Sequence, residues 1–215
     1  MARNYQKELE CLLEQIPAER PLSLLLHSCC APCSSYVIEY LSEYFRITVF
    51  YYNPNLYPDE EYEKRAEEQM RFIKSFPAKY PVEFMRGEFE KERFYEAVKG
   101  HEKEKEGGER CFLCYRLRLE ETARLAQRMG ADYFTTTLSI SPLKNAAKLN
   151  EIGEELAGVY GVSYLNSDFK KKNGYKRSVE LSREYGMYRQ DYCGCIFSKR
   201  ERDAQMEKKN SRKEY

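Results

Sequence analysis

Cysteines are the residues of this chain with the clearest capacity for chemistry. Seven of the eight fall into three tight groups: Cys29-Cys30-x-x-Cys33, Cys111-x-x-Cys114 and Cys193-x-Cys195. Thiolates are preferred ligands of zinc ions and iron–sulfur clusters, and paired thiols also serve as redox catalysts. The grouping therefore indicates a metal centre. The eighth cysteine, Cys11, stands alone in an amphipathic segment, where we expect it to be buried.

Two of the groups supply enough ligands for one metal site. Cys29-Cys30 and Cys111-x-x-Cys114 offer four thiolates, which suits either a tetrahedral zinc ion or a cubane iron–sulfur cluster. Side chains of adjacent cysteines diverge from a regular backbone, so they chelate a single ion less naturally than a C-x-x-C pair. A cluster can accept them at different corners. The spacing therefore favours iron–sulfur over zinc.

Three thiols are surplus to a four-ligand site. Cys33, Cys193 and Cys195 could form a redox pair, bind a second metal or lie in the core. Asp191 precedes Cys193 by two residues, so one short loop carries a carboxylate and two thiols. Such a mixed set suits a transition ion with an open position for a substrate oxygen. The alternative for Asp191 is an exposed carboxylate in a turn.

Length and composition set the class of protein. With 215 residues and 42% apolar content the chain suits one globular domain with a sizeable core. No apolar stretch reaches the length of a membrane span, so we expect a cytoplasmic protein with no membrane partner. In that reducing compartment, clustered cysteines are more often ligands or redox catalysts than structural disulfides.

The near-neutral net charge of +1 hides a basic C-terminal part. Residues 168–215 contain 14 basic and 8 acidic side chains. A polyanion such as RNA would bind to this part of the chain. Lys171, Lys172 and Arg177 are the best candidates for phosphate contacts, because tyrosines flank them. The alternative is a solvated basic surface that ends in a frayed tail.

The elements expected to position these residues alternate between strand and helix. Apolar or β-branched runs predict strands at residues 22–26, 47–52, 82–85, 133–138 and 162–165. Helical patterns lie between them at 34–44, 59–76, 89–99, 112–129 and 143–159. This predicts an α/β fold, with a doubly wound, mostly parallel five-stranded sheet in residues 1–167. A helical C-terminal segment, 168–198, and a polar tail, 199–215, complete one catalytic domain.

The motifs fall where such a sheet binds ligands. Residues 27–34 follow the first strand and residues 135–142 close the fourth, and a strand order of 3-2-1-4-5 makes those two ends neighbours. Cys111 and Cys114 open a long helix, whose positive end favours thiolates. The segment that carries Cys193 and Cys195 must fold back to join them. His27 is expected to be a hydrogen-bonded core residue, with proton donation as the alternative.

Five ordered motifs together carry a resemblance to a known family. They are residues 27–34, 51–55, 110–116 and 135–142 and the Tyr192-Cys193-Gly194-Cys195 sequence. With them the chain closely resembles the QueH-type epoxyqueuosine reductases. The resemblance implies a fold similar to the adenine-nucleotide α-hydrolases, with cysteines in place of their phosphate-binding loop. Nucleotide hydrolysis is therefore not expected.

The resemblance also implies an activity. That family removes the epoxide oxygen of epoxyqueuosine at the wobble position of tRNA, in the last step of queuosine biosynthesis, with iron–sulfur chemistry and without cobalamin. On this basis we expect Cys29, Cys30, Cys111 and Cys114 to hold a [4Fe–4S] cluster. We expect Cys33, Cys193, Cys195 and Asp191 either to provide a redox-active dithiol or to bind an additional iron ion.

The implied partners are tRNA carrying epoxyqueuosine and an electron donor that the sequence does not identify. Two readings from other classes stay open at this point. One is a zinc-stabilised RNA-binding module, and the other is a metal-free thiol-disulfide oxidoreductase.

Overall fold

The computed structural model describes residues 3–17 and 20–211 as an α/β fold. The strands are β1 (Leu22–His27), β2 (Phe45–Tyr51), β3 (Val82–Arg86), β4 (Tyr133–Thr136) and β5 (Ser163–Tyr164). The helices are α1 (Tyr5–Leu13), α2 (Ala31–Leu41), α3 (Asp59–Ser75), α4 (Lys91–Ala97), α5 (Glu109–Met129), the short 3-10 helix η1 (Thr137–Ile140), α6 (Ala146–Tyr160), α7 (Gly174–Glu184) and α8 (Ile196–Ser211). The predicted fold class is confirmed.

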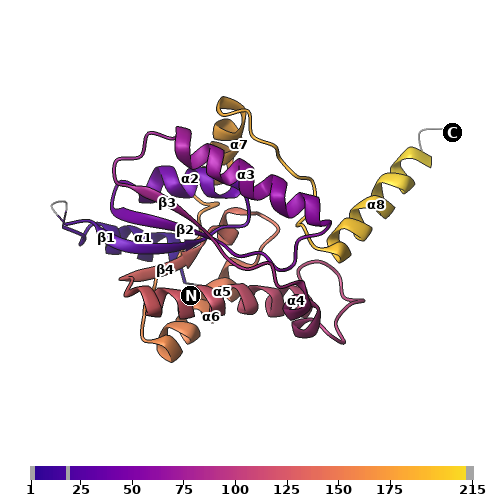
Figure 1. Cartoon of the computed structure of the whole chain (residues 1–215), viewed down its shortest axis with the longest axis horizontal. Coiled ribbons are helices and arrows are strands. Elements are labelled where there is room, and N and C mark those ends of the chain that lie inside the picture. The colour runs from indigo at the N-terminus through magenta and orange to yellow at the C-terminus, as the bar shows by residue number, and fades with distance from the viewer. Residues whose placement is uncertain (1–2, 18–19, 212–215) are drawn as a thin grey trace.

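The sheet has the order β3-β2-β1-β4-β5, and all four pairings are parallel. This is the predicted order, so the winding direction reverses between β1 and β4. Helices α2, α3 and α7 cover one face and α5 and α6 cover the other (Figure 1). Successive residues of β1 serve the two faces: Leu24 and Leu26 pack into the core beneath α2, and Leu25 packs against α5 and α6.

Several predicted boundaries shift for local reasons. The predicted strand at 133–138 is too long, because the hydroxyl of Thr136 caps η1 by accepting a hydrogen bond from the Leu138 N–H at 3.2 Å. Helix α2 begins three residues earlier than predicted, since Pro32 in its first turn already has the backbone angle of a helix. Cys11 is exposed, so the prediction that it is buried is wrong. Its place in α1 turns its side chain away from Leu9 and Leu13, which do pack into the core.

The chain beyond the sheet folds back over the carboxyl ends of the strands. Helix α7 packs on α2, and α8 leaves the site as an arm that projects from the body (Figure 1). Much of the predicted polar tail is therefore helical, while its residues 212–215, like residues 1–2, lie outside the described residues. The division at 167/168 and 198/199 stays a prediction. Within residues 3–17 and 20–211, every helix is too short or too polar to cross a membrane.

Candidate metal centre

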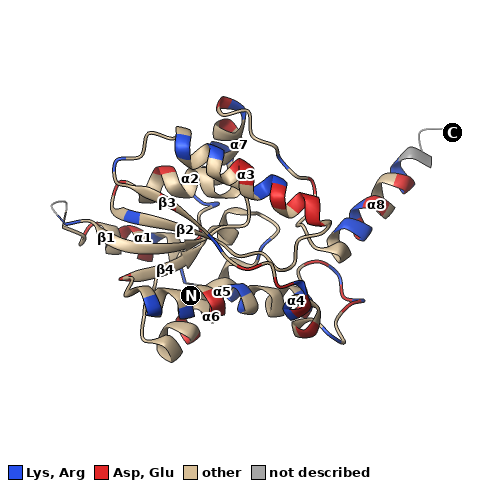
Figure 2. Ribbon diagram, viewed as in Figure 1, with Lys and Arg blue, Asp and Glu red and all other residues tan. Residues whose placement is uncertain are grey.

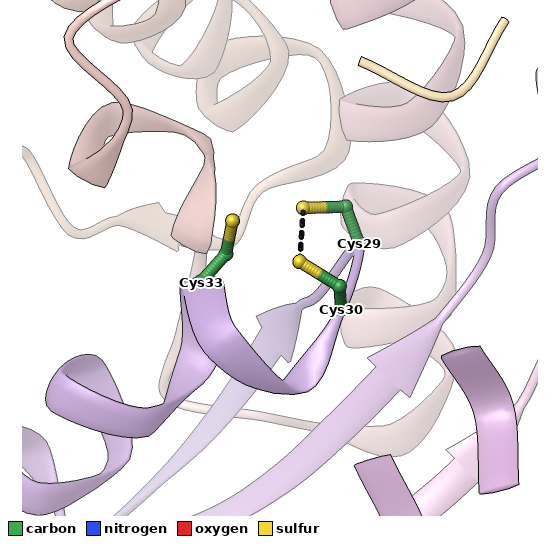
Figure 3. A group of neighbouring side chains, drawn as sticks. All are labelled: Cys29, Cys30 and Cys33. Carbon is green, nitrogen blue, oxygen red and sulfur yellow. Dashed lines mark hydrogen bonds between the residues drawn. The ribbon is translucent and has the colours of Figure 1, made fainter. Parts of the chain in front are cut away.

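The first thiol group is made by one short segment between β1 and α2. Cys29 follows the strand, Cys30 caps α2 with an extended backbone and Cys33 lies in the first turn of that helix. Their three sulfur atoms lie within 4.8 Å of one another, and those of Cys29 and Cys30 are 3.7 Å apart (Figure 3). We call these three residues the local thiol group. Their convergence shows that this segment can hold a metal.

One member of the local thiol group is set apart electrostatically. Burial opposes ionisation of Cys30, but hydrogen bonds from Cys29 and Cys33 and the charge of Arg65 outweigh it. The pKa of Cys30 therefore falls well below the ordinary thiol value. The side-chain amide of Gln190 adds a further hydrogen bond to its sulfur at 2.9 Å. The contact with Cys30 raises the pKa of Cys29, and contacts with both Cys29 and Cys30 raise the pKa of Cys33.

The second thiol group is assembled from two distant segments. Its members line one small cavity of about 20 Å³: Cys111, Cys114, Cys193 and Cys195. The first two lie in the opening turns of α5, and the other two lie in the loop before α8. We call these four the assembled thiol group. Burial raises the pKa of Cys114 to about 11 and that of Cys195 to about 12, so both thiols hold their protons in the metal-free protein.

Backbone contacts of Gly194 bring the C-terminal loop into place. Its carbonyl accepts a hydrogen bond from the Tyr57 N–H at 2.8 Å, and its φ of +122° is a conformation that favours glycine. A β-carbon at this position would lie 2.3 Å from a methyl group of Leu56. The expectation that this loop folds back is therefore confirmed, and it depends on a residue without a side chain.

A buried lysine touches the assembled thiol group. The Lys144 ammonium lies 3.0 Å from the sulfur of Cys193 and 2.9 Å from a carboxylate oxygen of Glu106, and its side chain is only 6% exposed. Burial opposes its charge, but Cys193, Tyr115 and Glu106 outweigh this and hold the pKa of Lys144 well above the ordinary value. Sequence reasoning missed this residue. The only signal in the sequence was its position, two residues after the motif at residues 135–142.

One face of α5 is directed at the site. Cys111, Cys114, Tyr115 and Arg118 recur at helical spacing, and all four line the same cavity. The Tyr115 hydroxyl and one terminal nitrogen of Arg118 are buried with no hydrogen-bond partner among the described residues. This periodic stripe was visible in the sequence, although only its cysteines were recognised.

His27 is a structural residue. It is fully buried, with Nδ1 2.8 Å from the Thr136 hydroxyl and Nε2 3.1 Å from the Tyr52 carbonyl. Because a carbonyl can only accept, Nε2 carries the proton and Nδ1 accepts from the hydroxyl. Burial lowers the pKa of His27 to about 3. The neutral ring therefore ties β1 to its neighbours, as the core interpretation predicted.

Other sequence-predicted site residues lie on the surface. Asp191 is 62% exposed, and Arg202 donates a hydrogen bond to it at 3.0 Å, so its carboxylate does not line the thiol cavity. Lys171, Lys172 and Arg177 lie in and before α7, on the side of the molecule that α2 occupies. Each pairs with a carboxylate: Lys171 with Asp168 at 3.9 Å, Lys172 with Glu10 at 2.6 Å and Arg177 with Glu39 at 2.7 Å.

The two thiol groups belong to one packed region. Cys29 and Cys30 share a buried cluster with Tyr115, and Cys33 and Cys111 pack against that cluster. The structure thus places Cys29 and Cys30 beside Cys33, and Cys111 and Cys114 in one cavity with Cys193 and Cys195. Both groups meet where β1 and β4 end.

Comparison with known proteins agrees with this geometry. The family model described as epoxyqueuosine reductase QueH matches residues 24–201. The chain belongs to this family. Proteins named epoxyqueuosine reductase QueH include one from Streptococcus pyogenes serotype M1, 43% identical over 199 residues, or 91% of this chain and 78% of that protein. The Staphylococcus epidermidis protein is 43% identical over 201 residues, covering 91% and 84%, and the Thermotoga maritima protein is 37% identical over 196 residues, covering 87% and 97%.

The donor set of this QueH family member fits a metal cluster. The candidate ligands of the two thiol groups are seven cysteine sulfurs. Soft thiolates bind iron–sulfur clusters, zinc or copper(I) in preference to calcium or magnesium. The unpartnered nitrogen of Arg118 and the hydroxyl of Tyr115 are donors that an anionic centre would satisfy. QueH proteins are oxidoreductases, and these cysteines could bind a metal cluster.

Proposed function

We propose that this chain reduces epoxyqueuosine to queuosine at the wobble position of tRNA, the last step of queuosine biosynthesis. Family membership across residues 24–201, joined to seven thiols at the carboxyl edge of the sheet, is the observation that carries the proposal. The substrate and the free thiols suit the reducing cytoplasm.

The proposed cofactor is a [4Fe–4S] cluster held by Cys29, Cys30, Cys111 and Cys114. Such a cluster would supply electrons one at a time. The shared packing of both thiol groups around Tyr115 supports a centre that draws ligands from each. The sulfur of Cys33 lies within 4.8 Å of those of Cys29 and Cys30, which makes it a thiol close to the proposed ligands.

The reaction sets the tasks of the remaining residues. Converting an epoxide into an alkene takes up two electrons and two protons and releases the oxygen as water. An electron donor outside this chain must therefore supply reducing equivalents, and the site must supply protons. The Lys144 ammonium, beside Cys193, holds protons at the mouth of the assembled thiol group.

Two alternative roles are proposed for Cys193 and Cys195. In one, the pair cycles between dithiol and disulfide. In the other, these thiols, with Cys33 and Asp191, bind an additional iron ion that accepts the epoxide oxygen. The contact of Lys144 with Cys193 and the exposed, Arg202-paired carboxylate of Asp191 support the dithiol version. Iron per chain in Cys193→Ser separates them: an unchanged count removes the additional iron.

Recognition of tRNA requires a pocket for a splayed base and cations for the flanking phosphates. We retain Lys171, Lys172 and Arg177 as the proposed contacts. Their carboxylate partners would have to yield to phosphate, so each contributes less than a free cation would. On both α7 and α8, acidic positions interrupt the basic ones (Figure 2).

The decisive experiment is anaerobic incubation of the iron-loaded protein with epoxyqueuosine-containing tRNA and a low-potential reductant, followed by nucleoside analysis. Queuosine should replace epoxyqueuosine, and omitting the protein or the reductant should leave the epoxide intact. The protein should be brown. A colourless zinc protein without turnover would support an RNA-binding module instead, and turnover without metal would support a thiol-disulfide oxidoreductase.

A further inference from the structure

Arg118 is a buried cation that no carboxylate neutralises. Its side chain is almost fully enclosed, at 1% exposure. Among the described residues, no aspartate or glutamate forms an ion pair with it within 4.0 Å. Arg65, the other fully buried arginine near the thiols, differs in this respect, because Glu61 pairs with it at 2.7 Å. A charge removed from water is costly unless an anion lies close to it.

The contacts of Arg118 place it between the two thiol groups. Its Nε donates to the Cys114 carbonyl at 3.3 Å, and one terminal nitrogen donates to the Asn53 side-chain oxygen at 3.4 Å. The amide nitrogen of Asn53 donates in turn to the Ser28 carbonyl at 2.8 Å, directly before Cys29. Three hydrogen bonds therefore link the guanidinium to the backbone of both the assembled and the local thiol groups.

The second terminal nitrogen of Arg118 has no partner within the described part of the chain. Its charge acts most strongly on Cys114, Cys193 and Cys29, which come from both groups. The same residue lines the cavity of the assembled thiol group. A donor and an uncompensated positive charge are thus directed at the place where an anionic centre would lie.

From these contacts we infer that Arg118 is the fixed counter-charge of the metal centre and raises its reduction potential. Each uptake of one electron makes a thiolate-bound centre more negative, with no bond formed or broken. A positive charge beside the centre stabilises the reduced form, and it is one of the factors that set such potentials. This inference rests on the proposed metal centre and assigns to Arg118 a tuning role within it.

The test measures the midpoint potential of the iron-loaded protein, by anaerobic titration with dithionite and electron paramagnetic resonance. In Arg118→Gln, iron per chain should be retained, and the ratio of reduced to oxidised centre at a fixed potential should fall at least about tenfold, or about 59 mV for one electron. Arg118→Lys should recover most of the potential. Arg116→Gln, an exposed position on the same helix paired with Glu155, is the matched control and should leave the potential unchanged.

Each outcome decides the assignment. A loaded Arg118→Gln protein with the potential of the unaltered protein overturns it. If Arg118→Gln holds no iron while Arg118→Lys does, the positive charge itself is needed and the assignment stands. If neither variant holds iron, the side chain acts through packing and the assignment fails. Should the unaltered protein bind no iron at all, the proposed function fails first, which is a separate result.

Discussion

The local and assembled thiol groups reach one edge of the sheet by different routes. Cys29, Cys30 and Cys33 are fixed by the end of β1 and the first turn of α2, so short-range backbone geometry alone holds their sulfurs within 4.8 Å. The assembled group needs the start of α5 and a loop about eighty residues later in the chain. Local geometry is robust to distant changes, whereas the assembled group depends on every contact that folds the C-terminal loop back.

The buried charges differ in the same way. Cys30 receives its hydrogen bond from Gln190, and its counter-charge, Arg65, is balanced by Glu61. On the assembled side, Lys144 is balanced by Glu106, but Arg118 is not balanced by a carboxylate. A buried cation without a carboxylate partner among the described residues therefore lies beside the assembled group, where Arg118 and Tyr115 also keep unpartnered donors. This difference indicates where an anionic cofactor completes the structure.

The largest expected effect tests whether the two groups share one centre. Cys30→Ser and Cys114→Ser should each lower iron per chain and reductase activity by more than about tenfold, since loss of even an outer contact can cost about 10–100-fold in metal affinity. Inductively coupled plasma analysis measures the iron. Cys11→Ser, exposed on α1, is the control and should keep both. If only one of the two variants loses iron, the shared centre is wrong.

A smaller effect should be confined to the assembled group. Lys144→Met removes the ammonium beside Cys193 and strands the Glu106 carboxylate, so activity should fall about tenfold or more. In metal-free protein the rate of Cys193 alkylation should change, because the Lys144 ammonium lies 3.0 Å from its sulfur. Mass spectrometry of the labelled peptides follows this rate. Lys144→Arg keeps the charge and should retain more activity, whereas equal losses in both variants would mean that the charge is not what matters.

A backbone change tests the dependence on remote packing. Gly194→Ala places a methyl group against Leu56 in a conformation that alanine disfavours, which should cost about 1–3 kcal/mol of unfolding free energy. Urea unfolding measures this cost, and iron should be retained less well. Gly158→Ala, in α6 with no neighbour within 4 Å, should leave stability unchanged or raise it. Full stability of Gly194→Ala would show that the loop adapts.

The smallest effect concerns the side from which tRNA approaches. Reversing Lys171, Lys172 and Arg177 to glutamate should weaken tRNA binding about 3–10-fold at low salt, and similarly across tRNA sequences, because phosphate contacts carry no base information. The same reversal at Lys79, at the amino end of the sheet, is the control. Filter binding over a salt series provides the measurement. Indifference to the triple reversal would move the RNA surface to the α8 side, beside the assembled group.

The sequence by itself determined the architecture and the local half of the site. Strand and helix periodicities depend on near neighbours, so the order β3-β2-β1-β4-β5 and the position of residues 27–34 at the switch point were predictable. The five motifs likewise predicted the family. Cys29, Cys30 and Cys33 follow from one turn of backbone, which spacing describes well.

Only the tertiary structure decided which distant groups meet. Spacing paired Cys111 and Cys114 with Cys29 and Cys30, while packing places them in one cavity with Cys193 and Cys195. Sequence offered Asp191 as a site carboxylate, yet Arg202 holds it at the surface. Lys144 and Arg118 left little trace in the sequence, because a lysine or arginine is expected in solvent. Their burial arises from contacts between segments far apart in the chain, and such contacts exist only once the chain has folded.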